Sequence, residues 1–352
     1  MGNYPWFAHR HVFLVQFGVL LQHASMGSIL EIRDLRVAYR SRNGDLSRAL
    51  DGVSFFLGPG EVLGVLGESG SGKSTLALSL LGLLPRDSVV ASGAVLFQGR
   101  DLLKAEPREL QAIRGKNISL IFQEPSVALH PTMRVGRQVR QILDAHGMGD
   151  RDELVRRTRE VFETLFAEEA ERIARSYPHQ LSGGQRQRVL IAQAIACRPS
   201  VVIADEPTAS LDPTTQKEIL DVFRGLRKNL GLTMIFITHN PALLSGFADR
   251  VLVFYAGRVA ELGPAKRVLT SPKHPYTQAL FRSIPPLDEP HDAGERSLPT
   301  IPPDPNRSFP PRSGCPFEPR CPERMEICKS RDPGFVSLSE SHMVSCFRYE
   351  NQ

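Results

Sequence analysis

The nine residues "GESGSGKST" (67–75) constrain the fold of this chain more than any other stretch. They follow "EVLGVLG" (61–67), an apolar run that predicts a buried strand, and lead into "STLALSLLGLL" (74–84), whose spacing predicts a helix. A G-x-x-x-x-G-K-[ST] sequence between a strand and a helix is a phosphate-binding loop. A glycine-rich turn that matches by chance is the alternative, and the strand, lysine and helix together disfavour it. We therefore predict an α/β protein built around a nucleotide site.

The chemistry of this loop indicates a nucleoside triphosphate such as ATP. Glycines let backbone N–H groups surround a phosphate, and the helix N-terminus adds unpaired donors. Lys73 can reach the β- and γ-phosphates, and the Ser74 hydroxyl can bind Mg²⁺. The predicted nucleotide-binding residues of the loop are Gly67, Glu68, Ser69, Gly70, Ser71, Gly72, Lys73, Ser74 and Thr75.

A second motif adds the chemistry of hydrolysis. "VVIADEP" (201–207) is an apolar strand that ends in two carboxylates, at the sheet edge where open α/β proteins bind ligands. Asp205 suits Mg²⁺, and Glu206 suits a residue that polarises the attacking water. Surface acids at the start of a loop are the weaker alternative, because the preceding strand is so apolar.

A third motif is a second helix start with the residues of a phosphate site. In "LSGGQRQR" (181–188), Ser182, Gly183 and Gly184 precede the helical run "VLIAQAIA". One nucleotide does not need two such helix starts from one chain.

Composition sets the remaining limits. At 352 residues the chain is long enough for about two domains, and 41% hydrophobic residues suffice for a globular core. A net charge of +5 indicates a solvated surface, not a nucleic-acid footprint. No apolar run approaches the roughly 20 residues that span a bilayer. Residues 1–25, with the apolar run 11–22, are interpreted as an upstream extension that need not be native; a membrane-surface segment is the alternative.

The order of patterns along the chain predicts its domains. Strand-like segments and the loop fall in 28–265, which is interrupted by a helical insert at about 124–185. Residues 266–352 form a C-terminal extension, whose segment 284–313 is rich in proline and predicts a linker or an extended arm.

Together these motifs resemble the nucleotide-binding subunits of ABC transporters. "GESGSGKST", "LSGGQ", "VVIADEP", "SLD" (210–212) and "TH" (238–239) carry the resemblance. It implies a P-loop NTPase (RecA-like) core with an antiparallel β subdomain and an inserted α-helical subdomain. It also implies two nucleotides held head to tail between two subunits, with the signature Ser182, Gly183, Gly184 and Gln185 of one closing over the loop of the other.

The same resemblance assigns single residues. Tyr39 would stack on adenine, and Gln123 would touch Mg²⁺ and relay the nucleotide state to the helical insert. His239 would contact the γ-phosphate, so that Glu206 and His239 are the predicted catalytic residues. Asp212 would pair across the dimer. A core aromatic, a turn glutamine and a core histidine are the alternatives for Tyr39, Gln123 and His239.

Three further stretches resemble the oligopeptide and dipeptide (peptide/nickel) importers. They are the region "IRGKNISLIFQEPSVALHPTMRVGRQ", the region "YPHQLSGGQRQRV", and the C-terminal "HPYTQALFRSIP" (274–285) with "GCPFEPRCPERMEICKSRDP" (314–333). His130 and "ASLDPTT" depart from the usual pattern without removing a catalytic group.

This branch implies an ATPase that powers uptake of di- or oligopeptides. Its partners would be a second ATPase subunit, by the branch a paralogue, two membrane permeases and an extracytoplasmic binding protein, with no nucleic acid. The chain would lie peripherally on the cytoplasmic face of the cell membrane. The alternatives are another solute (a nickel chelate, an opine or a sugar), a non-transport ABC ATPase, or an exporter ATPase, against which the C-terminal resemblance argues. The roughly 110 residues between loop and signature leave no room for the long insertions of repair and chromosome proteins.

Four of the five cysteines lie in the extension. Cys315, Cys321, Cys328 and Cys346 are separated by 5, 6 and 17 residues, which fits zinc spacing poorly and misses the plain ferredoxin spacings. Similar importer tails carry four cysteines around a [4Fe–4S] cluster, so we predict such a cluster here. Free thiols are the alternative. Cys197 is predicted to be a buried structural residue.

Overall fold

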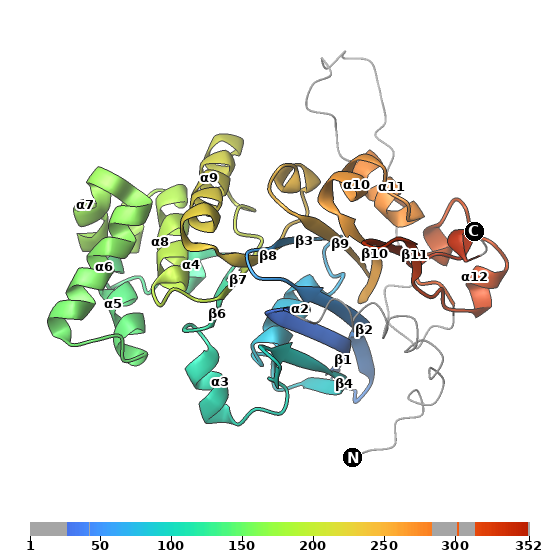
Figure 1. Cartoon of the computed structure of the whole chain (residues 1–352), viewed down its shortest axis with the longest axis horizontal. Coiled ribbons are helices and arrows are strands. Elements are labelled where there is room, and N and C mark those ends of the chain that lie inside the picture. The colour runs from blue at the N-terminus through green and yellow to red at the C-terminus, as the bar shows by residue number, and fades with distance from the viewer. Residues whose placement is uncertain (1–26, 42, 284–300, 303–313, 351–352) are drawn as a thin grey trace, which may run out of the picture.

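A computed structural model describes residues 27–41, 43–283, 301–302 and 314–350 (Figure 1). The predicted extension 1–25 and nearly all of the proline-rich segment 284–313 lie outside these residues. A mixed sheet runs through the middle of the molecule, with a helical group at one end of the long axis and the C-terminal extension at the other (Figure 1). The predicted α/β fold is confirmed.

The larger sheet carries the nucleotide motifs. In the described residues it has eight strands in the order β11-β12-β10-β9-β3-β8-β7-β6, and the five strands from β9 to β6 are parallel. Continuous apolar runs build the central strands, as expected where both faces of a parallel sheet are covered. The bounds are β3 Val62–Leu66, β6 Ile118–Ile121, β7 Val201–Asp205, β8 Thr233–Ile237, β9 Arg250–Tyr255, β10 Arg258–Pro264, β11 Val336–Ser339 and β12 His342–Val344. The strands predicted from "EVLGVLG" and "VVIADEP" are confirmed as β3 and β7.

A separate antiparallel sheet covers the phosphate-loop helix. Its order in the described residues is β2-β1-β4-β5. Leu76 and Leu80 of helix α2 are fully buried in one core with Val65 of β3 and Val95 of β4, so α2 packs between the two sheets. The bounds are β1 Leu30–Arg40, β2 Leu46–Leu57, β4 Ser88–Phe97, β5 Arg100–Asp101 and α2 Lys73–Leu80. The short helix α3 (Pro107–Ile113) was not predicted.

The helical group forms where the sequence turns to 3–4 spacing. Asp150 caps its longest helix by accepting the N–H groups of Asp152 and Glu153, and the apolar face of that helix buries Phe162 and Leu165. The helices are α4 Pro125–Ala128, α5 Val135–Ala145, α6 Arg151–Phe166, α7 Ala170–Arg175 and α8 Gly183–Ile195, followed by α9 Pro213–Leu230 on the sheet. Short 3₁₀ turns are η2 Ala167–Glu169, η3 Pro178–Gln180, η4 Pro241–Leu244, η5 Glu318–Arg320 and η6 Phe347–Tyr349.

The C-terminal extension continues the main sheet. After α10 (Ala265–Thr270) and α11 (Pro275–Arg282), the tail returns as β12, which pairs antiparallel with β10, and adds α12 (Ile327–Ser330). Glu261 of β10 is fully buried and accepts the N–H groups of Lys273 and His274, while its Oε1 lies 2.9 Å from Nε2 of His342. A buried carboxylate is stable only when paired in this way.

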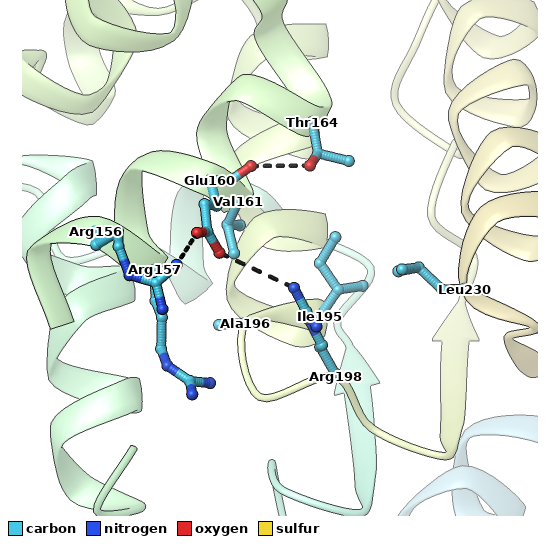
Figure 2. A pocket seen from close by; sticks show the side chains of 9 residues that line it. All are labelled: Arg156, Arg157, Glu160, Val161, Thr164, Ile195, Ala196, Arg198 and Leu230. Atoms are coloured by element: carbon cyan, nitrogen blue, oxygen red, sulfur yellow. Dashed lines mark hydrogen bonds and ion pairs between the residues drawn. The ribbon is translucent and has the colours of Figure 1, made fainter. Parts of the chain in front are cut away.

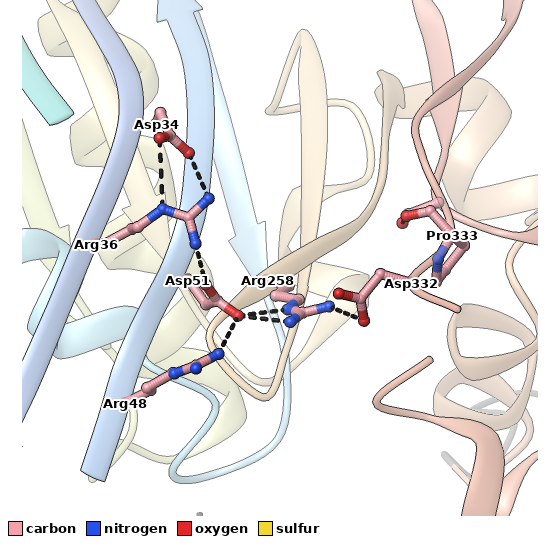
Figure 3. Close-up of polar contacts among 8 residues, drawn as sticks. Asp34, Arg36, Arg48, Asp51, Arg258, Asp332 and Pro333 are labelled. Carbon is pink, nitrogen blue, oxygen red and sulfur yellow. Dashed lines mark hydrogen bonds and ion pairs between the residues drawn. The ribbon is translucent and has the colours of Figure 1, made fainter. Parts of the chain in front are cut away.

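A second ion-pair network joins the extension to the antiparallel sheet. Asp51 of β2 is buried and accepts from Arg36 at 2.5 Å, Arg48 at 3.2 Å and Arg258 at 2.6 Å (Figure 3). Arg258 also donates to Asp332 of the tail at 2.8 Å. One arginine of the hairpin therefore links β2 to the C-terminal extension.

Candidate nucleotide site

The phosphate loop is shaped by glycines that no other residue could replace. Gly72 caps α2 with a φ of 109°, and a Cβ there would lie 2.5 Å from the carbonyl oxygen of Ala49. A Cβ on Gly67 would lie 2.4 Å from the carbonyl oxygen of Phe254. The loop is thus pressed between β2 and β9, with its backbone curled at the start of α2.

Lys73 lies at the centre of this loop. It is only 5% exposed, and its Nζ donates to the carbonyl oxygens of Gly67 at 2.9 Å and Glu68 at 2.8 Å. Burial lowers the pKa of Lys73, although Glu206, Asp205 and Glu68 act in the opposite direction. The backbone carbonyls of the loop therefore hold this ammonium group inside the loop.

Asp205 offers a buried oxygen beside the loop. Its Oδ1 is buried and has no hydrogen-bond partner in the described part of the chain. Burial raises the pKa of Asp205, and a hydrogen bond from Ser74 opposes the rise, which places the two side chains together. An unpaired buried carboxylate oxygen next to a hydroxyl fits a divalent cation such as Mg²⁺, which prefers oxygen ligands.

Glu206 stands at the centre of a polar cluster. Its Oε2 accepts from Nε2 of Gln123 at 3.3 Å and lies 3.2 Å from Nδ1 of His239. Its φ is 47°, a left-handed conformation that costs free energy for any residue but glycine. The ends of β6, β7 and β8 thus bring three side chains from distant parts of the sequence to one edge of the sheet.

Tyr39 of β1 lies at the other side of the loop. It is half-buried, and its hydroxyl is 3.0 Å from Oγ1 of Thr75. The aromatic residue is therefore attached to the first turn of α2, close to the loop. Its stacking on adenine stays a prediction, as do the nucleotide roles of the loop, Gln123, Asp205, Glu206 and His239.

The signature residues lie at the start of α8, at a different place. Ser182 accepts the N–H of Gln185 at 3.2 Å, and the Gln185 side chain accepts the N–H of Ser182, a reciprocal cap. Gly184 is packed so closely that a Cβ would lie 2.6 Å from Cγ2 of Thr215, the residue whose N–H and hydroxyl bond to Asp212. Those bonds lower the pKa of Asp212. Within the described residues, no hydrogen bond or ion pair joins this signature to the phosphate loop.

Comparison with known proteins identifies the family. A family profile for ABC transporters matches residues 50–209, and one described as "Oligopeptide/dipeptide transporter, C-terminal region" matches residues 260–328. The chain is 41% identical to the oligopeptide transport ATP-binding protein OppD of Salmonella typhimurium, over 91% of this chain and 93% of that protein. The chain belongs to the ATP-binding subunits of ABC transporters, in their oligopeptide and dipeptide branch.

Other relatives agree with this family. The dipeptide transport ATP-binding protein DppD of Bacillus subtilis is 40% identical, over 92% of this chain and 95% of that protein. Among solved structures, the dimeric bacterial ABC transporter cassette MJ0796 has a TM-score of 0.59 at 28% identity, covering 67% of this chain and 98% of that one. CbiO1 from Clostridium perfringens has a TM-score of 0.60 at 31% identity, covering 70% and 92%. This ABC subunit is accordingly an ATP-binding ATPase with the cassette fold.

Two residues of the extension reach the phosphate loop, and the sequence did not predict either contact. The Tyr276 hydroxyl accepts the backbone N–H of Glu68 at 2.9 Å, and the Arg320 guanidinium donates to both carboxylate oxygens of Glu68 at 2.9 Å. The stretch "HPYTQAL", which contains Tyr276, resembles the peptide importers and so draws attention to this residue. Nothing in its pattern indicates a contact with the phosphate loop.

The described part of the ABC subunit contains a cavity of about 270 Å³ away from these motifs (Figure 2). It lies between α6 and the end of α8, and Arg156, Arg157 and Arg198 line it. Arg156 pairs with Glu153 at 2.7 Å, and Arg198 lies 3.9 Å from Glu160. None of the predicted nucleotide residues borders this cavity, so it is not the candidate site.

The four cysteines of the extension lie near one another. Burial raises the pKa of Cys315 to about 12 and the pKa of Cys321 and Cys346 to about 11, and neighbouring thiols add to each rise. The backbone N–H of Cys315 donates to the carbonyl oxygen of Cys328 at 2.8 Å. However, no three or more His, Cys, Asp or Glu side chains of the described residues are grouped to hold a metal ion. The cysteines thus gather without forming a ready ligand set. Cys197 is buried, as predicted.

None of the described helices combines the length and apolar character needed to cross a membrane.

Proposed function

We propose that this chain hydrolyses ATP to power the uptake of di- or oligopeptides through an ABC importer. The observation that carries the proposal is the match to both parts of the peptide-transport subunits, the cassette at residues 50–209 and their C-terminal region at 260–328. OppD and DppD, which match over more than nine-tenths of this chain, are named for oligopeptide and dipeptide transport.

ATP would be bound by the loop 67–75. Backbone N–H groups and Lys73 would surround the phosphates, and Tyr39 would stack on the base. Ser74, Asp205 and Gln123 would hold Mg²⁺, which supplies positive charge to the triphosphate when bound. The partnerless Oδ1 of Asp205 beside Ser74 supports this assignment.

Glu206 would act on the water that attacks the γ-phosphate. Its carboxylate is the acceptor at the centre of the Gln123–Glu206–His239 cluster, so a water in the same place could be oriented by it. His239 is 61% exposed, which leaves its ring free to contact the γ-phosphate. Gln123 would carry the nucleotide state to the helical group that follows it.

A second ATPase subunit, by the branch a paralogue, would complete each site. The signature residues Ser182, Gly183, Gly184 and Gln185, with Asp212, stand apart from the loop of their own chain, which supports a role at a partner's nucleotide. The related cassette MJ0796 is described as dimeric. The donors at the start of α8 suit a phosphate from across the interface.

Two membrane permeases would dock beside Gln123. Phe122 and Val127 are 49% and 79% exposed, a pair of apolar side chains at the entrance to the helical group. Exposed apolar patches at such a place are typical of protein interfaces. An extracytoplasmic binding protein would deliver the solute, the chain would lie at the cytoplasmic face of the membrane, and no nucleic acid would be bound.

The domain assignment is part of this proposal. Residues 28–265 would be the ATPase domain, with the helical insert at about 124–185, and 266–352 the C-terminal extension typical of the peptide importers.

An iron–sulfur cluster on Cys315, Cys321, Cys328 and Cys346 is proposed on the resemblance alone. The thiols do not form a ready ligand set, so no step of the mechanism depends on it. Iron and absorbance of anaerobically purified protein, compared with Cys315→Ser and with Cys197→Ser as control, test it; a colourless, iron-free sample ends the idea.

Transport by the reconstituted complex tests the function. With its permeases, partner ATPase and binding protein in vesicles, the complex should import labelled di- or oligopeptides only with ATP, and Lys73→Ala should abolish import. Import of a nickel chelate, an opine or a sugar in place of peptides would overturn the peptide assignment and keep the ATPase role. ATP turnover without import of any solute would favour a non-transport ABC ATPase.

A further inference from the structure

Three parts of Glu68 in the phosphate loop form hydrogen bonds: its carbonyl oxygen, its backbone N–H and its carboxylate. Its carbonyl oxygen accepts from Lys73 within the loop. Its backbone N–H and its carboxylate are bound from outside, by Tyr276 and Arg320. Both outer partners belong to the C-terminal extension, so two of the three attachments of this loop residue depend on it.

The ion pair between Arg320 and Glu68 is a two-point contact. The guanidinium of Arg320 forms two parallel hydrogen bonds of 2.9 Å to Glu68, the strong two-point arrangement of arginine with a carboxylate. The Arg320 side chain is only 6% exposed and the Glu68 side chain 33%. Arg320 also donates to the Tyr255 hydroxyl at 3.2 Å and to the carbonyl oxygen of Pro302 at 2.6 Å. These bonds hold the Arg320 guanidinium in the orientation in which it binds the Glu68 carboxylate.

The hydroxyl contact is built from the "HPY" sequence. His274 caps α11 by accepting the N–H of Tyr276 at Nδ1, at 3.0 Å. Burial lowers the pKa of His274 to about 4, so the ring is neutral and able to accept at neutral pH. Tyr276 is fully buried, and its ring packs against Tyr255 at 4.5 Å and Phe317 at 5.4 Å between centroids. The helix cap and the aromatic packing together orient the Tyr276 hydroxyl toward the backbone N–H of Glu68.

We infer that Tyr276 and Arg320 are positioning residues that hold the phosphate loop in its ATP-binding conformation through Glu68. Neither residue needs to touch the nucleotide. They act on Glu68, which adjoins the loop's first glycine and shares its carbonyl with Lys73. Arg320 lies in the segment between Cys315 and Cys321, so this contact also connects the cysteine-bearing tail to the ATP site. The inference rests on the proposed ATP site.

Binding of the fluorescent analogue mant-ATP with Mg²⁺ to the purified full chain tests the inference. Glu68→Gln and Arg320→Gln should each weaken the affinity about 10-fold, the scale of a lost charge-assisted bond. The double variant should be no weaker than the worse single variant, because both remove one contact. Tyr276→Phe, which removes only the hydroxyl, should weaken binding by a smaller factor. In the assembled complex, KM for ATP should rise while kcat changes little.

Two further variants separate this role from a merely structural one. The exchange Glu68→Arg with Arg320→Glu should recover affinity lost in the single variants. Arg348→Gln removes an arginine of the same extension that pairs with Glu323 and should bind mant-ATP as the native chain does. Because Glu68→Gln changes only the charge of a part-exposed side chain, it keeps the test decisive if Arg320→Gln does not fold.

Wild-type affinity in Glu68→Gln, or effects of the two single variants that simply add, would overturn the inference. Lys73→Ala separates a failure of the inference from a failure of the proposed ATP site. If Lys73→Ala loses mant-ATP binding while the Glu68 and Arg320 variants keep it, the ATP site stands and the inference fails. If Lys73→Ala also binds mant-ATP normally, the proposed ATP site is itself wrong.

Discussion

The Oε2 atom of Glu206 lies 3.2 Å from Nδ1 of His239, although the two residues are 33 positions apart along the chain. They meet because β7 and β8 are parallel neighbours, so that the residues following each strand emerge at the same edge of the sheet. Gln123 follows β6 and reaches the same oxygen. A carboxylate that already accepts from two side chains is well placed to orient a water.

Glu206→Gln should stop ATP turnover without preventing ATP binding. The amide has nearly the shape of the carboxylate but cannot take a proton, so kcat should fall by about 100-fold or more. The affinity for mant-ATP should stay within about twofold, because the proposed binding groups of the loop, Lys73 and the backbone N–H groups, are unchanged. Turnover by phosphate release and binding by fluorescence measure the two effects. Glu340→Gln, an exposed carboxyl of the tail, is the matched control. Unchanged turnover in Glu206→Gln would contradict the role.

Gly184→Ala should impair the assembled ATPase and not the isolated nucleotide site. The added Cβ would lie 2.6 Å from Cγ2 of Thr215, so the Thr215 side chain or the helices α8 and α9 must shift. Such overpacking costs about 1–3 kcal/mol, enough to lower turnover of the complex by roughly tenfold. Affinity of the single chain for mant-ATP should not change, since the signature stands apart from its own loop. Weaker binding by the single chain would instead show that the signature serves the site of its own chain.

Gly225→Ala is the control for that substitution. Gly225 lies inside α9, and nothing comes within 4 Å of a Cβ added there. Alanine favours a helix interior over glycine by about 0.5–1 kcal/mol, so this variant should be as active as the native chain and slightly more stable. Loss of activity in both variants would point to a general effect on α9.

The parts of the fold that the sequence predicted are those with long or strong patterns. The apolar runs of β3 and β7 and the helical spacing of α6 each bury a continuous surface, so their pattern alone indicates the element. The sheet edge at Asp205 and Glu206 followed from the same pattern, because carboxylates after a buried parallel strand must emerge at its C-terminal end.

The attachments of the C-terminal extension could not be predicted in this way. Strands β11 and β12 have four and three residues, too few for a periodic signal. Strand β12 forms against the edge of β10, and β11 pairs in turn with β12. The contact of Arg320 with Glu68 joins residues 252 positions apart. No local pattern contains such information; it arises only when the helix α11 and the tail fold back onto the loop.

Asp51→Asn should destabilise the fold, because Asp51 is the common acceptor of three arginines. Its side chain is 5% exposed, and the loss of its charge leaves Arg36, Arg48 and Arg258 close together without a shared counter-charge (Figure 3). Removing one partner of a buried ion pair costs about 3–5 kcal/mol. Urea unfolding should show a free energy of unfolding lower by about this amount. Asp34→Asn is the control: Asp34 is 46% exposed and pairs with Arg36 near the surface, so it should cost less than about 1 kcal/mol. Equal losses in the two variants would refute the central place of Asp51.

The same network predicts how stability depends on pH. Burial alone would raise the pKa of Asp51, but Arg258 and Arg36 outweigh it and hold the pKa below its usual range. The unfolded carboxyl therefore takes up a proton near pH 4 while the folded one is still ionised. Between the two pKa values the unfolded state binds more protons, so the stabilisation is complete above about pH 4 and is lost as the pH falls through the folded value. Urea unfolding from pH 5 down to pH 3 should show a steeper loss of stability in the native chain than in Asp51→Asn, which has no carboxyl to titrate. Parallel losses in the two proteins would mean that other carboxylates, and not Asp51, set the acid sensitivity.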